Sequence, residues 1–276
     1  MYEVARFGPV VRIRMSRAFL GRPTLWVHAF WVDGLLIDSG CHHTVPDLAA
    51  ALHQEGLTVE QVVSTHSHED HVGANAYIRH RFGVMPRAHP LALDRLARPE
   101  TWREMDLYRQ FFWGLVEGCP AEPLGEAVET DRYRFRVLHT PGHSKDHIAL
   151  FEEQGWLFSG DLLISPRLQH VRREENPLLL LDSMRQVAAL PVRQLFCSHA
   201  YRVHDSAQPL AEKVAYWEKL QSDGRALARE GLSVRAITRR LLPARGLIEL
   251  LTRGDFSRIN LMRGLLGEEQ SNQPHL

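Results

Sequence analysis

The sequence predicts a layered α/β domain followed by a small helical C-terminal domain. Short segments rich in Val, Ile and aromatic residues alternate with amphipathic helical segments through roughly the first two hundred residues, a pattern typical of sheets covered by helices. From Pro209 onward the composition favours helices. We therefore expect two domains, residues 1–205 and residues 206–276.

The composition is that of an ordinary globular protein. The chain has 276 residues, of which 44% are hydrophobic and 24% charged, and its formal net charge is zero, so no general field attracts nucleic acid or membranes. Three cysteines do not make a disulfide framework. Residues 1–14 lack the apolar segment of a signal peptide, and no apolar run is long enough to span a bilayer. We expect a cytoplasmic protein without a membrane partner.

The first half of the chain begins with strands and continues with helices and strands in alternation. Asp33-Gly34 between two apolar runs predicts a tight hairpin, and Asp38-Ser39-Gly40 ends its second strand. Pro46 stands in the first turn of an expected helix, which Gly56 ends. The expected strands are residues 10–15, 25–31 and 59–64, and the expected helices are residues 45–55, 74–81, 91–96 and 102–118.

The second half continues with strands and ends in helices. Glu153-Gln154-Gly155 marks a second hairpin. Ser233 is the expected N-cap of one C-terminal helix, and Asp255 is that of the last helix. The expected strands are residues 133–138, 148–151, 156–158 and 192–197, and the expected helices are residues 178–189, 210–229, 234–242, 247–251 and 256–266.

Aromatic residues are concentrated in the helical segment 102–118. Two interpretations are open for this cluster: a lid over an apolar substrate, or side chains that fill a core. The cluster consists of Trp102, Tyr108, Phe111, Phe112 and Trp113.

Candidate metal ligands are concentrated between the expected strand 59–64 and the helix after it. Histidines this close in sequence rarely belong to a hydrophobic core, because each would need a hydrogen-bond partner. His66 and His68 are two residues apart and point the same way in extended backbone, whereas Asp70 and His71 follow where the chain turns. This suits two neighbouring metal ions better than one. The alternative is a solvated histidine-rich loop.

Three more candidates follow other expected strands. His143, Asp161 and His199 each come where a strand ends, so they converge with the first group at the edge of the sheets, where small-molecule sites form. Imidazole and carboxylate ligands suit Zn, and also Fe or Mn.

Together these motifs resemble the metallo-β-lactamase superfamily over roughly residues 10–201. The resemblance is carried by His-x-His-x-Asp-His, by the Thr-Pro-Gly-His-Ser turn, by Asp after Ser-Gly, by a late His and by the strand pair ending at Asp38-Ser39-Gly40. It implies a four-layer αβ/βα sandwich with a dinuclear centre. By that pattern the first metal is held by His66, His68 and His143, the second by Asp70, His71 and His199, and Asp161 bridges them.

The resemblance implies a metal-dependent hydrolase. Two divalent ions, Zn in first place, would share a hydroxide that attacks the substrate, and Asp70 would also orient this hydroxide. Asp161 stands where the commonest true β-lactamases of this fold have Cys, which argues against antibiotic hydrolysis. A bridging Asp is typical of the glyoxalase II, lactonase and ribonuclease branches. The C-terminal domain resembles more loosely that of the β-lactamase-like protein 2 group.

Three functions follow from these observations. The first is hydrolysis of a small ester, thioester or lactone, which makes a small molecule the partner. The second is a phosphodiesterase or ribonuclease acting on single-stranded nucleic acid, suggested by the basic C-terminal domain. The third is a regulatory protein on a hydrolase fold. A homodimer is also left open. The basic residues are Arg235, Arg239, Arg240, Arg245, Arg253, Arg258 and Arg263.

Residues around the ligands allow two readings each. His147 either supports a ligand carboxylate from behind or is a satisfied buried histidine. Arg172 and its neighbours His170 and Arg173 either bind an anionic substrate or belong to a solvated loop. Glu69 lies inside the ligand motif, and we do not expect it to bind metal.

Overall fold

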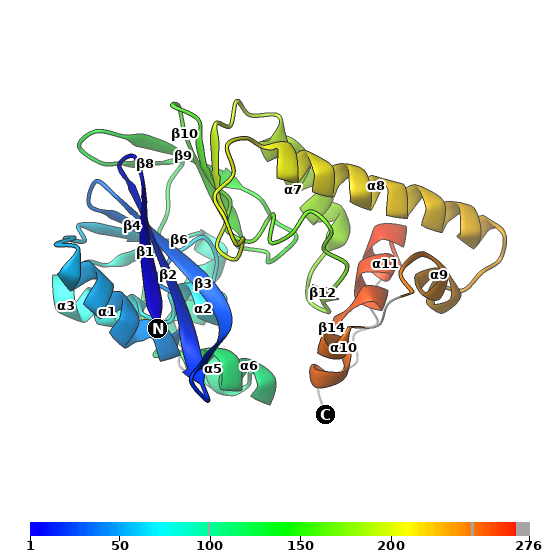
Figure 1. The fold of residues 1–276 in the computed structure, drawn as a ribbon, viewed down its shortest axis with the longest axis horizontal. Helices are drawn as coiled ribbons and strands as arrows, with labels where there is room; N and C mark the ends of the chain where they lie inside the picture. The colour runs from blue at the N-terminus through cyan, green and yellow to red at the C-terminus, as the bar shows by residue number, and fades with distance from the viewer. Residues whose placement is uncertain (99, 244–245, 269–276) are drawn as a thin grey trace.

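Two β-sheets lie face to face between layers of helices. The structure is a computed structural model that describes residues 1–98, 100–243 and 246–268. Arg245 and residues 269–276, the last part of the expected C-terminal domain, lie outside the described residues. Figure 1 shows helices α1 (Val45–Gln54) and α3 (Asn75–Phe82) beside one sheet, and helices α7 (Pro177–Ala188) and α8 (Gln208–Arg229) beside the other. The expected four-layer sandwich is confirmed.

The first sheet has seven strands in sequence order. Its first four strands are antiparallel neighbours, and the last three add in parallel. The expected hairpin at Asp33-Gly34 joins the third and fourth strands, and both residues have the positive φ that this turn needs. The strands are β1 (Tyr2–Phe7), β2 (Val10–Phe19), β3 (Arg22–Val32), β4 (Leu35–Ile37), β5 (Gln61–Val63), β6 (Pro86–Ala88) and β7 (Glu122–Pro123).

The second sheet has five strands in the order β13-β11-β10-β9-β8. These are β8 (Ala127–Glu129), β9 (Arg134–His139), β10 (Ile148–Glu152), β11 (Trp156–Phe158) and β13 (Gln194–Phe196). A separate two-stranded ladder pairs β12 (Val171–Arg172) with β14 (Phe256–Ser257). This ladder joins the loop after Asp161 to the C-terminal helices.

The other helices connect these strands or form the C-terminal segment. They are η1 (His42–Thr44), α2 (Glu69–Val72), η2 (Pro90–Ala92), α4 (Leu93–Ala97), α5 (Glu100–Arg103), α6 (Leu107–Trp113), α9 (Val234–Leu241), α10 (Leu247–Leu251) and α11 (Arg258–Leu266). In the described parts of the chain, no helix is both long and apolar enough to cross a membrane.

Phenylalanine rings fill the space between the two sheets. Phe30 of the first sheet packs edge-on against Phe158 and Phe196 of the second, with ring centroids 5.5 Å from each. The outer face of the first sheet is covered by α1 and α3, whose apolar side chains join a second buried cluster. The sandwich therefore has a separate apolar layer on each face of its first sheet.

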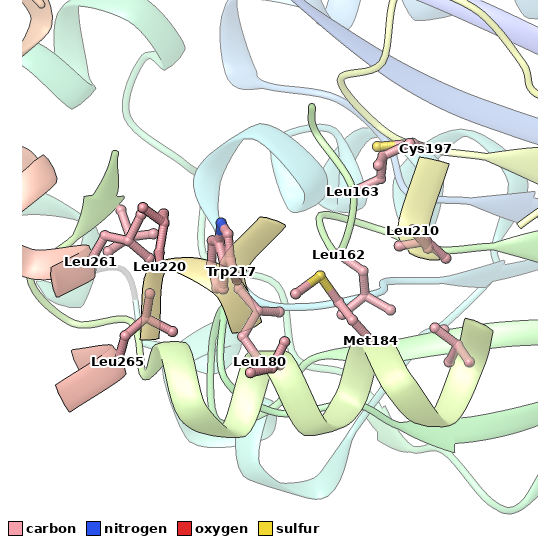
Figure 2. Close-up of a cluster of buried hydrophobic side chains, with 14 of the residues drawn as sticks. Leu162, Leu163, Leu180, Met184, Cys197, Leu210, Trp217, Leu220, Leu261 and Leu265 are labelled. Atoms are coloured by element: carbon pink, nitrogen blue, oxygen red, sulfur yellow. The ribbon is translucent and has the colours of Figure 1, made fainter. Parts of the chain in front are cut away.

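The C-terminal helices share a core with the second sheet. Trp217 of α8 and Leu261 of α11 lie in one buried cluster with Leu180 and Met184 of α7 (Figure 2). This cluster also includes Leu162, directly after Asp161. The division into residues 1–205 and 206–276 stays a prediction, and α8 begins close to that boundary.

Two expected elements were wrong in detail. The helix expected at residues 102–118 is two short helices, α5 and α6, and it stops at Gly114, whose φ is 82°. The last helix begins at Arg258, and its N-cap is Ser257, whose hydroxyl accepts from the Asn260 N–H. Asp255 is not the cap, because residues 256–257 form strand β14 first.

Lys213 of α8 is a buried cation behind the Asp161 loop. Its Nζ donates to the carbonyl oxygens of Leu162 and Leu163, at 2.7 and 3.0 Å. Burial lowers the pKa of Lys213 to about 8. The folded state therefore holds this proton less tightly than the unfolded chain does.

We expect the stability advantage of the native protein over Lys213→Met to grow with pH. Because the folded pKa lies below the unfolded one, the charged lysine costs the folded state most below about pH 8, and this cost disappears toward about pH 10.4. Between about pH 7.5 and about pH 9.5 the difference in unfolding free energy should rise by about 2 kcal/mol. Urea unfolding at both pH values measures it. A pH-independent difference would contradict a lowered pKa.

Candidate metal centre

Four strand ends bring the expected ligands together. β5 leads into the segment that carries His66 to His71, and the turn between β9 and β10 carries His143. Asp161 follows β11, and His199 follows β13. Strands of both sheets therefore end at one place, as the sequence predicts.

Gly73 allows the ligand loop to approach its neighbour closely. Its N–H donates to the Gly40 carbonyl oxygen at 2.7 Å. A Cβ at residue 73 would collide with the backbone of Cys41 and His42. Only glycine fits there, so the ligand loop lies directly against the turn that follows β4.

Three imidazoles form the first group of ligand atoms. Nδ1 of His68 lies 3.0 Å from Nε2 of His66 and 3.0 Å from Nε2 of His143. All three side chains are buried. Their facing nitrogen atoms lie within 4.8 Å of one another, close enough to bind one ion.

Asp70, His71 and His199 form a second group, which Asp161 joins to the first. The three facing atoms of the second group lie within 4.8 Å of one another. Asp161 lies 3.4 Å from Nε2 of His71, of His199 and of His143, so it reaches both groups. All seven expected ligands are therefore assembled as two adjoining groups with Asp161 between them. Their binding of metal stays a prediction.

Buried atoms at this place fit a cation. Oδ1 of Asp70, Oδ1 of Asp161 and Nε2 of His71 are buried and have no hydrogen-bond partner among the described residues. An unsatisfied buried polar atom is costly, and metal coordination is one way of satisfying it. Carboxylate oxygen and imidazole nitrogen suit Zn, Fe or Mn.

The electrostatics differ between the two groups. Burial lowers the pKa of His66 and His68 well below the ordinary value, which favours the neutral imidazole that metals bind. Burial acts in the same direction on His71 and His199, but the carboxylates, Asp161 foremost, outweigh it and raise the pKa of both. The second group thus attracts positive charge.

Asp38 holds the second group from behind. Its Oδ2 accepts from Nδ1 of His71 at 2.8 Å, which turns Nε2 of that ring toward Asp161. The same carboxylate accepts from the N–H and hydroxyl of Thr65 and from the hydroxyl of Ser198. It therefore ties the ligand loop to ends of strands in both sheets.

His147 supports Asp161 through the backbone. The Asp161 N–H donates to Nε2 of His147 at 3.1 Å, and Nδ1 of that ring lies 2.8 Å from Oγ1 of Thr140. His147 is fully buried. The expected contact with a ligand carboxylate is therefore absent among the described residues, and His147 is a buried histidine with a partner at each ring nitrogen, one of them the backbone of Asp161.

The aromatic segment packs against the centre. The indole of Trp113 lies 6.2 Å from the His199 ring, and Trp102 is fully buried in a neighbouring cluster. Arg109 of α6 forms a two-pronged ion pair with Glu69, at 2.7 and 2.6 Å. Trp102 and Trp113 thus fill a core, while Phe111 remains partly exposed.

Comparison with known proteins places this arrangement in a family. Residues 28–199 match the metallo-beta-lactamase superfamily, and this segment contains all seven expected ligands. The chain belongs to this superfamily. Superfamily membership together with the clustered histidines and aspartates implies divalent metal ions at this centre.

Several relatives of this chain are hydroxyacylglutathione hydrolases. The chain is similar to a hydroxyacylglutathione hydrolase from Xanthomonas euvesicatoria, with 32% identity over 178 residues, which cover 63% of this chain and 58% of the relative. This chain thus spans less than two thirds of that relative's length.

Solved structures share the fold. A beta-lactamase domain protein from Burkholderia ambifaria aligns with a TM-score of 0.74 and 21% identity, covering 96% of this chain and 88% of its own. TTHA1623, solved in a di-iron-bound form, aligns with a TM-score of 0.55 and 27% identity, covering 68% of this chain and 93% of its own.

Several residues that support the expected ligands were not predicted from the sequence. The Asp38-Ser39-Gly40 motif was recognised in the sequence, but the contact between Asp38 and His71 could not be predicted from it. Glu174 and Glu175 lie beside His68 and His143, yet no sequence signal separates them from a solvated charged run. Arg109 lies in the aromatic segment 102–118, and no sequence pattern marked it as a partner of Glu69 and Glu174.

We expect Asp38→Asn to weaken metal binding about 10–100-fold, because His71 loses its charged partner. Asparagine tolerates the positive φ of residue 38, so the substitution adds little backbone strain. Competition with a chromophoric chelator measures the dissociation constants. Asp182→Asn, at an exposed position, is the matched control. Equal affinities in both variants would contradict the role of Asp38.

Proposed function

We propose that this chain is a dinuclear metal-dependent hydrolase of small acyl thioesters. The observation that carries the proposal is the assembly of two ligand groups that share Asp161. The similarity to hydroxyacylglutathione hydrolases favours a thioester over an ester or lactone. Asp161 in place of Cys argues against antibiotic hydrolysis.

Each ligand has a proposed task. His66, His68 and His143 would hold one ion, Asp70, His71 and His199 the other, and Asp161 both. When bound, two divalent ions supply a water molecule of lowered pKa and polarise the acyl carbonyl oxygen. Asp70, whose buried Oδ1 has no hydrogen-bond partner in the described part of the chain, would also orient the attacking water.

A cleft beside the first group can hold a small molecule. It measures about 1190 Å³ and is bounded by the α4–α6 segment, by the turn that carries His143, by the start of α7 and by residues of the C-terminal segment, and none of the seven expected ligands is among the residues that line it. Glu174 and Glu175 line it, and they contact His68 and His143. Its walls carry both signs of charge, because Arg95, Arg109, Lys145 and Arg173 stand among the carboxylates of Glu104, Asp106, Glu174, Glu175, Asp255 and Glu268.

The nucleic-acid alternative finds less support. Arg258 is buried and paired with Glu249, so it does not present its charge to a polyanion. Arg235, Arg239 and Arg240 are exposed on α9, where no aromatic side chain stands among them for base stacking. A phosphodiesterase or ribonuclease therefore remains the second candidate function, and only the sequence suggests it.

We expect the protein loaded with Zn²⁺ to hydrolyse an S-hydroxyacyl glutathione thioester in preference to a matched ester, a lactone and labelled single-stranded RNA. Thiol release and product chromatography follow these reactions. Cleavage of RNA without thioester turnover would replace the proposal with the phosphodiesterase. No turnover of any substrate by protein containing two ions would overturn the hydrolase assignment.

We expect Asp70→Asn to lower kcat/KM for the thioester by roughly 100-fold or more, since loss of a direct ligand should cost at least as much as loss of its support. Asp94→Asn, whose partner Arg98 is on the surface, serves as the control and should keep full activity. An active Asp70→Asn protein with normal metal content would contradict the role of Asp70.

A further inference from the structure

Two adjacent carboxylates face the imidazoles of the first ligand group. Oε2 of Glu175 lies 3.0 Å from Nδ1 of His143, and Oε1 of Glu174 lies 3.4 Å from Nε2 of His68. In each ring this is the nitrogen turned away from the other imidazoles. Glu175 is buried, whereas Glu174 is partly exposed at 44%.

The two rings need opposite tautomers. His143 offers Nε2 to the group, so its proton must lie on Nδ1, while His68 offers Nδ1 and must carry its proton on Nε2. A carboxylate accepts hydrogen bonds and cannot donate when ionised. Glu175 therefore stands where it can accept the His143 proton, and the Glu174 carboxylate lies 3.4 Å from the nitrogen that must carry the His68 proton.

Four contacts hold the loop that carries these carboxylates. The N–H of Arg172 donates to Oε1 of Glu175 at 2.7 Å, and the N–H of Asn176 donates to the Gly142 carbonyl beside His143. Arg109 donates to Oε1 of Glu174 at 3.3 Å. Strand β12 pairs with β14 of the C-terminal segment. These contacts restrain the loop that carries the two carboxylates.

We propose that Glu175, assisted by Glu174, is a positioning residue that sets the tautomers and ring orientations of His143 and His68 for metal binding. This inference rests on the proposed metal centre and assigns to the loop 172–176 a role in building it. The C-terminal segment contributes through β14, and α6 contributes through Arg109. Neither Glu174 nor Glu175 needs to touch the metal for this role.

Glu175→Gln is a sharp test because an amide has one accepting oxygen. The Arg172 N–H can only donate, so the amide oxygen should stay beside it and the NH₂ should face Nδ1 of His143. That nitrogen must then accept, and the proton moves to Nε2, the nitrogen that faces His68 and His66. The variant keeps the volume of the side chain while it reverses the tautomer.

We expect the affinity for one Zn²⁺ ion to fall about 10–100-fold in Glu175→Gln, measured by chelator competition. The visible spectrum of the Co²⁺-loaded protein should change with it. Long-range ¹H–¹⁵N correlation spectra of the metal-free proteins, at about pH 8 where ordinary histidines are neutral, should show the His143 proton on Nδ1 in the native protein and on Nε2 in the variant.

The matched control is Glu152→Gln. Glu152 is also buried and accepts a backbone N–H, that of Gln154 at 2.7 Å, but it lies at the far end of β10 from the His143 turn. It should leave Zn²⁺ affinity and tautomers unchanged. Glu174 is partly exposed, so Glu174→Gln should weaken Zn²⁺ binding less than Glu175→Gln does. If the Glu175→Gln protein does not fold, Glu174→Gln tests the positioning role in its place.

Unchanged affinity and an unchanged His143 tautomer in Glu175→Gln would overturn this inference, as would equal losses in Glu152→Gln. If the native protein binds no Zn²⁺ at all, the proposed metal-dependent hydrolase is wrong. If the native protein binds Zn²⁺ and Glu175→Gln binds it equally well, only the positioning role is wrong. Loss of affinity in Glu175→Gln with a reversed tautomer and an intact control supports the positioning role.

Discussion

Three carboxylates, those of Asp38, Asp70 and Asp161, are buried around the single imidazole of His71. Asp38 lies 2.8 Å from its Nδ1, and Asp161 and Asp70 lie 3.4 and 3.9 Å from its Nε2. Burying this much negative charge is costly unless positive charge lies among the oxygens. This negative charge raises the pKa of His71, and a divalent ion between Asp70 and Asp161 would compensate it. The fold is arranged to hold these groups together despite their repulsion.

Both sheets contribute to that restraint. The Asp38 carboxylate at the end of β4 accepts from Thr65 after β5 in the first sheet and from Ser198 after β13 in the second. Behind these contacts, Phe30 of the first sheet packs against the stacked rings of Phe158 and Phe196 in the second sheet, and this packing holds the two sheets together. Because the core between the sheets is close-packed, the strand ends cannot separate to relieve the repulsion.

The sequence predicts well which histidines and aspartates lie together, because most of that pattern is local. Three histidines and an aspartate in the loop at residues 66–71 have few alternatives, and strands of a sandwich end at shared edges. The supporting residues could not be predicted, because their roles depend on distant partners. Glu175 acquires its position from β12 pairing with β14, and the end of α6 at Gly114 depends on close contact with His42. Neither pairing leaves a periodic pattern in the chain.

Anomalous diffraction from crystals grown with Zn²⁺ tests the dinuclear centre most directly. We expect two peaks about 3.5–4 Å apart, one contacting His66, His68 and His143 and the other contacting Asp70, His71 and His199, with Asp161 touching both. A single peak at saturating Zn²⁺, or peaks that avoid Asp161, would contradict a shared dinuclear centre.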